Sequence, residues 1–311
     1  MDKKATLRHG TAFMVAGGLL LGTLGVFVEE AGVHPLMTVW GRCAFGLAAL
    51  TLWGVAARRL PELRLAWADL RWALAAGVLV IANWALFFAA IERTSIGVAT
   101  VVFHVQPLWV LVLGAWWLRE RVRGVQWVAV GVALAGLALA SGLLQAQWPT
   151  HDGHAYVLGV LMCLGGSFSY ALVTLIAKLA TRVSSFALAW WQCVVGVAAL
   201  LPWATTHGGE VTATSWAWLA GLGVLHTGLA YVLLYAGMAR LPTGRIAVLQ
   251  FVYPVAAIAV DWAMYGRALG GVQLVGVALM GLALLSLRRT PAHEITPPAP
   301  LRPGCAGPRP S

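Results

Sequence analysis

Runs of about 20 apolar residues, separated by short polar segments, recur along the whole chain. A bilayer core about 30 Å thick is crossed by roughly 20 helical residues, so each run predicts one transmembrane helix. The predicted helices cover residues 11–28, 35–57, 72–91, 95–117, 125–144, 156–178, 184–204, 216–238, 243–265 and 271–288. The pattern therefore predicts an all-α integral membrane protein with ten spans.

Composition agrees with this pattern, because 60% of the 311 residues are hydrophobic and only 10% are charged. A soluble domain has about 25% charged residues, which leaves too few here to cover a water-exposed surface. Although the net charge is +10, the basic residues lie between apolar runs and form no continuous face. We therefore expect the lipid bilayer as a partner and no nucleic acid.

The positions of lysine and arginine predict the orientation, since these residues are retained on the cytoplasmic side. With the N-terminus inside, all but three of the 21 lysines and arginines fall on the cytoplasmic side. Of the exceptions, Arg93 and Arg267 fall outside and Arg42 lies within a span. The distribution predicts that both termini are cytoplasmic.

The second half of the chain repeats the first. At an offset of 147 residues, Arg93 aligns with Arg240, and Pro107 aligns with Pro254. At an offset of 150 residues, Trp40 and Cys43 align with Trp190 and Cys193 in the same way. Two unrelated apolar helices share alanine and leucine by chance, but rarely tryptophan, proline and arginine at constant offsets.

The repeat sets the expected domain organisation. Residues 1–144 form one five-helix unit, 145–155 a connecting loop, 156–288 the second unit, and 289–311 a proline-rich tail predicted to be disordered in the cytoplasm. Because five is odd, the second unit enters the membrane the other way up. Inverted repeats are typical of secondary transporters that bind their solute near the midplane. A duplicated scaffold with no transport role is the alternative.

Two segments carry a resemblance to a known family. Residues 91–136 (IERTSIGVATVVFHVQPLWVLVLGAWWLRERVRGVQWVAVGVALAG) and 238–281 (MARLPTGRIAVLQFVYPVAAIAVDWAMYGRALGGVQLVGVALMG) each show small residues, a mid-helix proline and then a glycine-rich helix. This pattern resembles the EamA-type transporters of the drug/metabolite transporter superfamily. The acidic residue that ends the fourth helix in the family is present as Glu120, but Arg267 stands at the equivalent position of the second repeat.

The resemblance implies a multi-pass transporter of a bacterial inner membrane. It further implies alternating access and export of small organic metabolites, with amino acids or their derivatives as the expected class. A homodimer is a possible assembly. A membrane-embedded enzyme and an uncoupled channel are the rival hypotheses. Saturable flux with counterflow would separate a transporter from both.

Pro107 and Pro254 predict breaks at equivalent places in the fourth and ninth helices. Each proline removes a backbone donor, and within lipid such a break is tolerated where protein or a wet cavity supplies a partner. We therefore expect both helices to line a cavity, although a kink that only shapes packing is the alternative.

Polar and aromatic residues gather on single faces of the third, fourth, eighth and ninth helices. Aromatic walls with a few amides and imidazoles suit an organic solute better than a bare ion. The candidate substrate-binding residues are Asn83, Trp84, Phe87, His104, Gln106, His226, Tyr231, Gln250 and Tyr253. No motif for a metal or a cofactor accompanies them, so we expect neither.

Arg42 and Asp261 are the charges placed well inside spans, where an unpaired charge is costly. Their depths match, so we expect an ion pair between them, with Glu29 and Glu30 as alternative partners for Arg42. If Asp261 instead faces the cavity alone, it becomes a candidate proton carrier.

Overall fold

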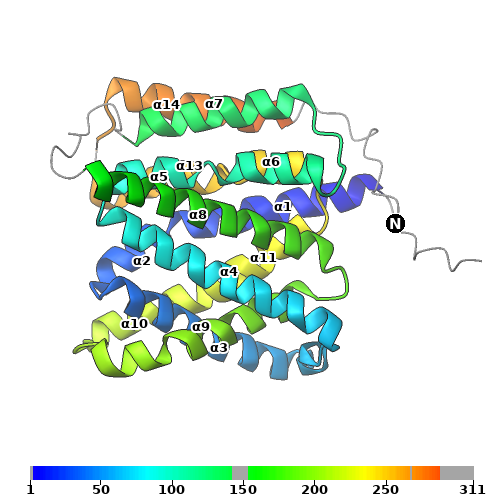
Figure 1. Cartoon of the computed structure of the whole chain (residues 1–311), viewed down its shortest axis with the longest axis vertical. Helices are drawn as coiled ribbons and strands as arrows, with labels where there is room; N and C mark the ends of the chain where they lie inside the picture. Colours follow the sequence, from blue (N-terminus) through cyan, green and yellow to red (C-terminus); the bar gives the residue numbers. More distant parts are fainter. Residues whose placement is uncertain (1–2, 142–152, 267, 288–311) are drawn as a thin grey trace, which may run out of the picture.

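The computed structural model describes residues 3–141, 153–266 and 268–287 of the chain. Within these ranges the regular elements are all helices, and they lie roughly side by side in one bundle (Figure 1). Most of the 145–155 segment and the whole 289–311 tail fall outside the described residues. The predictions about those two segments stay predictions.

The first repeat contains seven α-helices and one short 3₁₀ turn. They are α1 (Lys3–Gly22), α2 (Leu24–Ala31), α3 (Pro35–Ala56), η1 (Leu60–Leu63), α4 (Trp67–Ile91), α5 (Ile96–Phe103), α6 (Gln106–Trp116) and α7 (Gly124–Ala140). In the turn η1, Arg59 donates a hydrogen bond to Glu62 (Nη2 to Oε2, 2.8 Å). That interaction is the main reason that the pKa of the Glu62 carboxyl lies below its usual value.

In the second repeat, whose helix breaks only partly match those of the first, the described elements are seven α-helices and one π-helix. They are α8 (Gly153–Leu179), α9 (Ser185–His207), α10 (Ala213–Gly221), the π-helix η3 (Leu222–Leu229), α11 (Ala230–Met238), α12 (Thr243–Leu249), α13 (Val252–Tyr265) and α14 (Gly271–Ser286).

Three helices of the two repeats start where a hydroxyl caps the first turn. Ser95, Ser184 and Thr212 accept hydrogen bonds from the backbone N–H groups of Val98, Ala187 and Ser215.

Eight helical segments of the described residues are long and apolar enough to cross a membrane. They are Lys4–Ala31, Pro35–Ala56, Trp67–Ile91, Gly97–Trp116, Gly153–Leu179, Ser185–His207, Ala213–Met238 and Thr243–Tyr265. The helices α7 and α14, at the predicted fifth and tenth spans, are apolar but have 17 and 16 residues. At 1.5 Å per residue they reach about 25 Å, so the count of ten spans stays a prediction.

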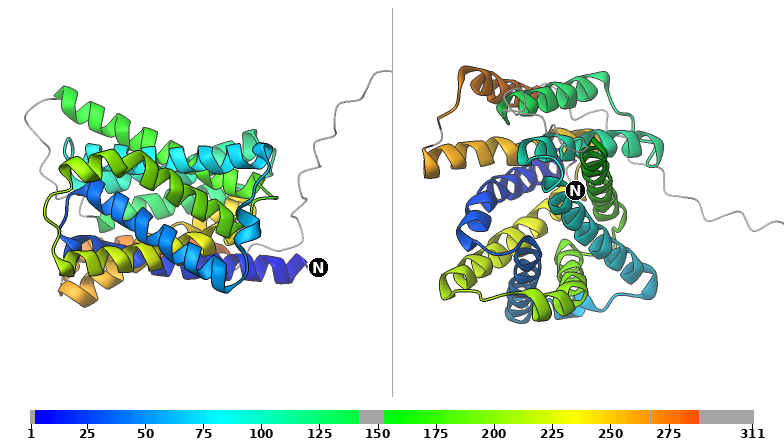
Figure 2. Two further views of the ribbon diagram at one scale, coloured as in Figure 1. Left: turned by 90° about the horizontal axis from the view of Figure 1, so that it is seen from below. Right: turned by 60° about the vertical axis from the view of Figure 1, so that its left-hand side comes forward.

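The helices pack in a pattern that is unchanged when the two repeats are exchanged. The helix α4 packs on α8 just as α11 packs on α1, while α3 pairs with α9 and α7 pairs with α14. In Figures 1 and 2 the α7–α14 pair lies at one edge of the bundle and the α3–α9 pair at the opposite edge. The helices α1 and α8 begin at opposite ends of the bundle, so the second repeat is inverted relative to the first (Figure 1).

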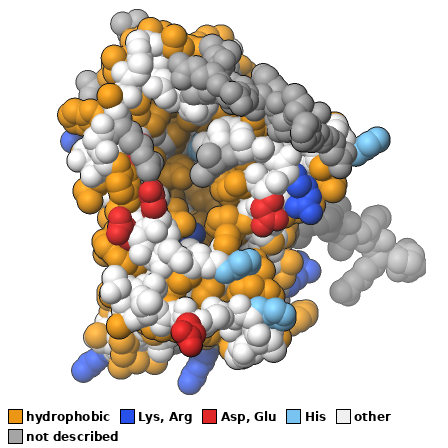
Figure 3. All heavy atoms as spheres, turned by 90° about the vertical axis from the view of Figure 1, so that its left-hand side faces the viewer, with side chains coloured by type: hydrophobic (Ala, Val, Ile, Leu, Met, Phe, Trp, Pro, Cys, Tyr) orange, Lys and Arg blue, Asp and Glu red, His pale blue; other side chains and the backbone are white. Residues whose placement is uncertain are grey.

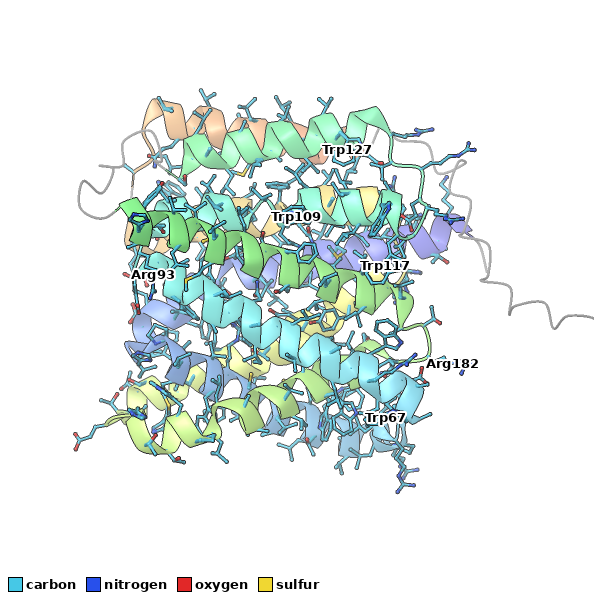
Figure 4. The ribbon with its side chains drawn as sticks, viewed as in Figure 1. Trp67, Arg93, Trp109, Trp117, Trp127 and Arg182 are labelled. Carbon is cyan, nitrogen blue, oxygen red and sulfur yellow. The ribbon has the colours of Figure 1, made fainter. Side chains whose placement is uncertain are left out.

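Charged and aromatic side chains distinguish the two ends of the bundle. Trp67, Trp117 and Arg182 lie at one end and Arg93 at the other (Figure 4). Trp67 and Trp117 are 73% and 50% exposed, as expected for tryptophans at a membrane–water boundary. We call the end with Arg182 the basic end, and the end with Arg93 the opposite end.

Candidate solute-binding site

A buried arginine lies where α3 packs against η3. Arg42 on α3 is 5% exposed, and its Nε donates a hydrogen bond to the Thr227 hydroxyl at 2.9 Å. Its guanidinium carbon lies 4.3 Å from the centre of the Trp84 ring and 6.0 Å from that of Tyr231. These contacts offset part of the cost of a charge at this depth.

Close backbone contact between α3 and η3 brings Arg42 to Thr227. A Cβ built at Gly223 would lie 2.5 Å from the Phe45 Cβ and 2.9 Å from the Arg42 carbonyl oxygen, so only glycine fits. Thr227 lies four residues further along η3, whose π-helical turns are wider than α-helical ones. The glycine thus lets α3 approach the π-helix closely enough for Arg42 to reach the hydroxyl.

A cavity next to Arg42 lies between the two repeats. Its walls are Cys43, Val80, Trp84, Ala189, Gln192, Cys193, Thr227 and Tyr231. Three pairs of these residues are equivalent in the repeat alignment: Cys43 with Cys193, Val80 with Thr227, and Trp84 with Tyr231. The cavity therefore lies on the pseudo-two-fold axis. It measures about 10 Å³, which is room for roughly one water molecule.

The far wall of this cavity is fixed by a second buried hydrogen bond. The Tyr235 hydroxyl on α11 donates to the Gln192 side-chain oxygen on α9 at 2.5 Å. Gln192 is 5% exposed and Tyr235 is 1% exposed. Gln192 is also the equivalent of Arg42 at the offset of 150 residues. The two repeats therefore carry an amide and a guanidinium at equivalent positions.

The two broken helices meet beside this centre. The helix α5 ends at Phe103 and α6 begins at Gln106, while α12 ends at Leu249 and α13 begins at Val252. Each break comes just before its proline, Pro107 or Pro254. Across the interface between the breaks, the rings of His104 and Tyr253 stack with their centres 5.8 Å apart. Both repeats thus contribute an irregular helix segment to the middle of the bundle.

At the basic end of the bundle, a network of polar contacts connects the repeats. Glu120, after α6, forms an ion pair with Lys178 at the end of α8. Its other oxygen accepts hydrogen bonds from the Thr243 backbone N–H at 2.8 Å and from the Thr243 hydroxyl at 2.7 Å. A Cβ at Gly114 would overlap the Thr243 side chain. The helices α6, α8 and α12 are therefore in close contact here.

The opposite end of the bundle is hollowed. Figure 3 views the molecule from that end and shows a depression with hydrophobic walls and acidic side chains near its margin. The exposed acidic residues of the helix ends and loops on this side are Glu29, Glu30, Glu92 and Glu210. A separate cavity of about 340 Å³ lies against Trp40, Ala204, Gly208 and Trp216.

The sequence matches the EamA-like transporter family model twice, over residues 8–142 and 157–289. The chain belongs to the EamA-like transporter family. Both matches coincide with the halves that the internal offsets relate, so the two-repeat architecture and the multi-pass membrane location are established.

Two of the relatives to which this EamA-like protein is similar are named as transporters. It is 26% identical to the uncharacterized transporter YxxF of Bacillus subtilis (strain 168) over 256 residues, which is 81% of each chain. It is 28% identical over 269 residues to an uncharacterized transporter of Archaeoglobus fulgidus, which covers 86% of this chain and 92% of the relative. The protein RarD of Streptomyces exfoliatus is 31% identical over 232 residues, or 70% of this chain and 66% of the relative.

A solved crystal structure supports the fold of this family member. The structures align with a TM-score of 0.79 over 90% of this chain and 98% of the other, at 21% identity. At that identity the likeness speaks for the fold alone.

Not all the candidate residues lie around the cavity of this EamA-like protein. Trp84 and Tyr231 line it, and their contact with a solute stays a prediction. The Asn83 side chain instead donates to the Gly166 carbonyl at 2.8 Å, and Gln106 donates to the Thr174 hydroxyl at 3.4 Å. Both amides therefore hold neighbouring helices to α8.

The remaining aromatic and imidazole candidates flank the centre. The rings of Phe87 and Phe103 pack with their centres 4.9 Å apart. His226 on η3 is fully buried, and its Nε2 lies 2.8 Å from the hydroxyl of Thr23, at the turn between α1 and α2. Gln250 keeps both polar atoms of its side chain buried without a hydrogen-bond partner among the described residues.

The expected ion pair between Arg42 and Asp261 does not occur among the described residues. Arg42 is bound by Thr227 and the aromatic rings, and the salt bridges of the described residues do not include it. Asp261 is partly exposed on α13, and Glu30, an alternative partner, accepts a hydrogen bond from Tyr265 at 3.2 Å. Similar depth in the membrane did not imply contact, because depth leaves rotation about the helix axis open.

Two features of the site were missed by sequence reasoning. Gln192 aligns with Arg42 at the same offset of 150 residues that aligns Trp40 with Trp190. The repeat was identified from identical residues only, and these two residues differ. The contact of Glu120 with Lys178 joins two residues that the charge distribution had already placed on one side of the membrane. The repeat offset indicates Gln192, and the shared side of the membrane indicates the pairing of Glu120 with Lys178.

Proposed function

We propose that the protein is a secondary transporter that moves small organic solutes across a bacterial inner membrane by alternating access. The observation that carries the proposal is the cavity beside Arg42, where six of the eight lining residues form equivalent pairs from the two repeats. A site on the pseudo-two-fold axis keeps its walls when one repeat rocks against the other, so it can face either side in turn.

The difference between the two ends of the bundle supports alternating access. The Glu120 network draws the repeats together at the basic end, while the opposite end is hollowed (Figure 3). Because the second repeat is inverted, the helix ends that lie on one side of the membrane in the first repeat lie on the other side in the second. Rocking about the axis would therefore open the basic end and close the other one, which gives two states of similar packing.

The orientation follows from the positive-inside rule. We assign the end with Arg182 to the cytoplasm and the end with Arg93 to the outside, with ten spans and both termini inside. On this assignment the described state is open to the outside and closed to the cytoplasm. Export as the direction, and amino acids or their derivatives as the solutes, come from the family resemblance.

The rival functions find less support in the site. A channel needs a continuous polar pathway, but the polar centre around Arg42 is enclosed by aromatic rings and the basic end is closed. A membrane-embedded enzyme needs acid, base or nucleophilic groups gathered at one place. His104 and His226 instead face different partners, Tyr253 and Thr23.

The proposal is tested first by a screen for the solute. Cells with and without the protein are compared for resistance to added metabolites and metabolite analogues and for the metabolites that accumulate in the medium. A solute found in this way is then followed in proteoliposomes that contain the purified protein. Flux that saturates and is accelerated by the same solute on the other side supports a transporter, while non-saturating flux supports a channel.

Variants of the cavity walls connect this activity to the site. Trp84→Ala and Tyr231→Ala should each reduce the flux at least tenfold while the protein still reaches the membrane, because each removes one wall of the cavity. Trp127→Ala is a matched control on α7, far from the cavity (Figure 4). Normal flux in both cavity variants would contradict the assignment of the site.

A further inference from the structure

Two buried hydrogen-bond donors stand at equivalent positions of the two repeats, beside the cavity. The Nη2 of Arg42 and the Nε2 of Gln192 are buried, and neither has a hydrogen-bond partner among the described residues. Arg42 Nε donates to the Thr227 hydroxyl, and Gln192 Oε1 accepts a hydrogen bond from the Tyr235 hydroxyl. An unpaired buried donor is costly, and a charged one more so, which points to a missing acceptor.

One donor lines the cavity, and the other lies next to it. Gln192 is one of its walls, and Arg42 contacts two other walls, the Thr227 hydroxyl at 2.9 Å and the Trp84 ring at 4.3 Å. The two donors are also equivalent in the repeat alignment, so the axis runs between them. The hydrogen bonds to Thr227 and Tyr235 fix each side chain, while Arg42 Nη2 and Gln192 Nε2 stay without a partner among the described residues.

The chemistry of the missing group follows from these donors. Two N–H donors with one positive charge select an acceptor with a negative charge, and a planar guanidinium suits the oxygens of a carboxylate. The equivalent position in the other repeat is an amide rather than a second arginine, so the cavity neutralises one negative charge. The cavity beside the donors is small. Trp84 and Tyr231 are the walls that the apolar part of a solute would contact.

We propose that Arg42 and Gln192 bind the carboxylate of the transported solute, and that the solute is a small organic monocarboxylate whose apolar part lies against Trp84 and Tyr231. This inference rests on the proposed transport function for its biological meaning, but the binding itself requires no transport. The cavity of the described state has room for about one water molecule, so its walls have to separate to admit the carboxylate and the rest of the solute.

Binding is measured as a shift in the melting temperature of the purified protein in detergent. The probes are benzoate, phenylacetate and hexanoate, each paired with its amide, together with benzylamine and inorganic phosphate. At least one carboxylate should raise the melting temperature with a saturable dose dependence, whereas its amide and benzylamine should not. If no carboxylate stabilises more than its amide, or if phosphate stabilises as well as the best carboxylate, the proposal is wrong.

Three variants assign the effect to the site. Arg42→Gln should weaken binding of the best carboxylate at least tenfold, and Gln192→Leu should weaken it several-fold while Arg42 is retained. Arg64→Gln makes the same chemical change on an exposed loop and should bind as the original protein does. Undiminished binding in both cavity variants would overturn the proposal. Should Arg42→Gln fail to fold, Arg42→Lys and Gln192→Leu give the same test.

The same samples separate this inference from the proposed function. Arg42-dependent binding of a carboxylate without its flux in proteoliposomes would leave the site assigned and contradict transport. Flux of a neutral or cationic solute that is unchanged by Gln192→Leu would support transport and contradict the carboxylate site.

Discussion

The Lys178 ammonium and the Glu120 carboxylate form an ion pair that joins the second repeat to the first at the basic end of the bundle. The two side chains are 13% and 12% exposed, so the pair is largely shielded from water. Thr243 completes the binding of the carboxylate from the start of α12. One acidic side chain thus fixes the ends of two helices of the other repeat.

We predict that removing either charge of this pair destabilises the protein more than removing both. Glu120→Gln leaves Lys178 without its partner, and Lys178→Gln does the same to Glu120, at a cost of about 3 kcal/mol for a mostly buried charge. The double variant leaves no stranded charge and should recover part of the loss. Melting temperatures of the three variants in detergent check this, and additive losses would show that the pair contributes nothing.

A second prediction concerns the opening of the basic end. Cysteines placed at positions 120 and 178 and joined by a short cross-linker should stop the flux of the solute, because alternating access requires the repeats to separate there. Reductive cleavage of the cross-link should restore the flux. The two single-cysteine variants, treated in the same way, are the controls. Full flux in the cross-linked protein would contradict a movement at this end.

The partner of Arg42 gives a third prediction. Because its Nε binds the Thr227 hydroxyl, Arg42→Gln and Thr227→Val should be non-additive in stability, with a coupling of about 0.5–3 kcal/mol. Arg42→Gln and Asp261→Asn should be additive to within about 0.5 kcal/mol, as for side chains that do not touch. Double-variant cycles of melting temperature measure both. Strong coupling to Asp261 would instead restore the ion pair expected from the sequence.

The helices were the part of the fold that the sequence predicted best. The apolar runs 35–57 and 243–265 end within a residue of the observed segments Pro35–Ala56 and Thr243–Tyr265. The first helix was predicted too short, at 11–28, because its ends extend past the apolar core into polar sequence, from Lys3 to Ala31 with a turn at Thr23. Apolar length reports the part of a helix that lies within lipid, not the part beyond it.

The site was predicted less completely, because contacts between helices depend on rotations that periodicity does not fix relative to a neighbour. Trp84 and Tyr231 were found because each repeat carries an aromatic residue at the same place. The π-helix around Thr227 shifts the faces of that span, and nothing in the apolar pattern of 222–229 indicates it. Asn83 was proposed for the solute, yet it holds α4 to α8, since a polar residue on an inward face serves either purpose.

Reporter fusions provide a fourth prediction, for the assigned orientation. Reporters fused after residues 64, 121, 180 and 289 should indicate the cytoplasm, and those after 32, 148 and 208 the outside. The reason is the collection of basic residues on one side of the membrane, which the positions of Arg182 and Arg93 at opposite ends support (Figure 4). A cytoplasmic signal after residue 148 would contradict ten spans, because that segment joins the two repeats.

The last prediction concerns the contact of α3 with η3 that brings Arg42 to Thr227. Gly223→Ala places a Cβ 2.5 Å from the Phe45 Cβ and 2.8 Å from the Gly46 backbone nitrogen. Neither neighbour can move without shifting α3, so we expect a loss of about 1–3 kcal/mol in stability, as for other overpacked interiors. The hydrogen bond between Arg42 and Thr227 should lengthen as well, and binding at the cavity should weaken.

Gly281→Ala on α14 is the matched control for this variant. A Cβ at Gly281 meets nothing within 4 Å, so this change should keep the melting temperature or raise it slightly, because alanine favours a helix over glycine by roughly 0.5–1 kcal/mol. Melting temperatures of the two variants, measured side by side, test the contact. If Gly223→Ala melts at the temperature of Gly281→Ala, α3 and η3 do not approach as described, and the position of Arg42 at the axis loses its structural basis.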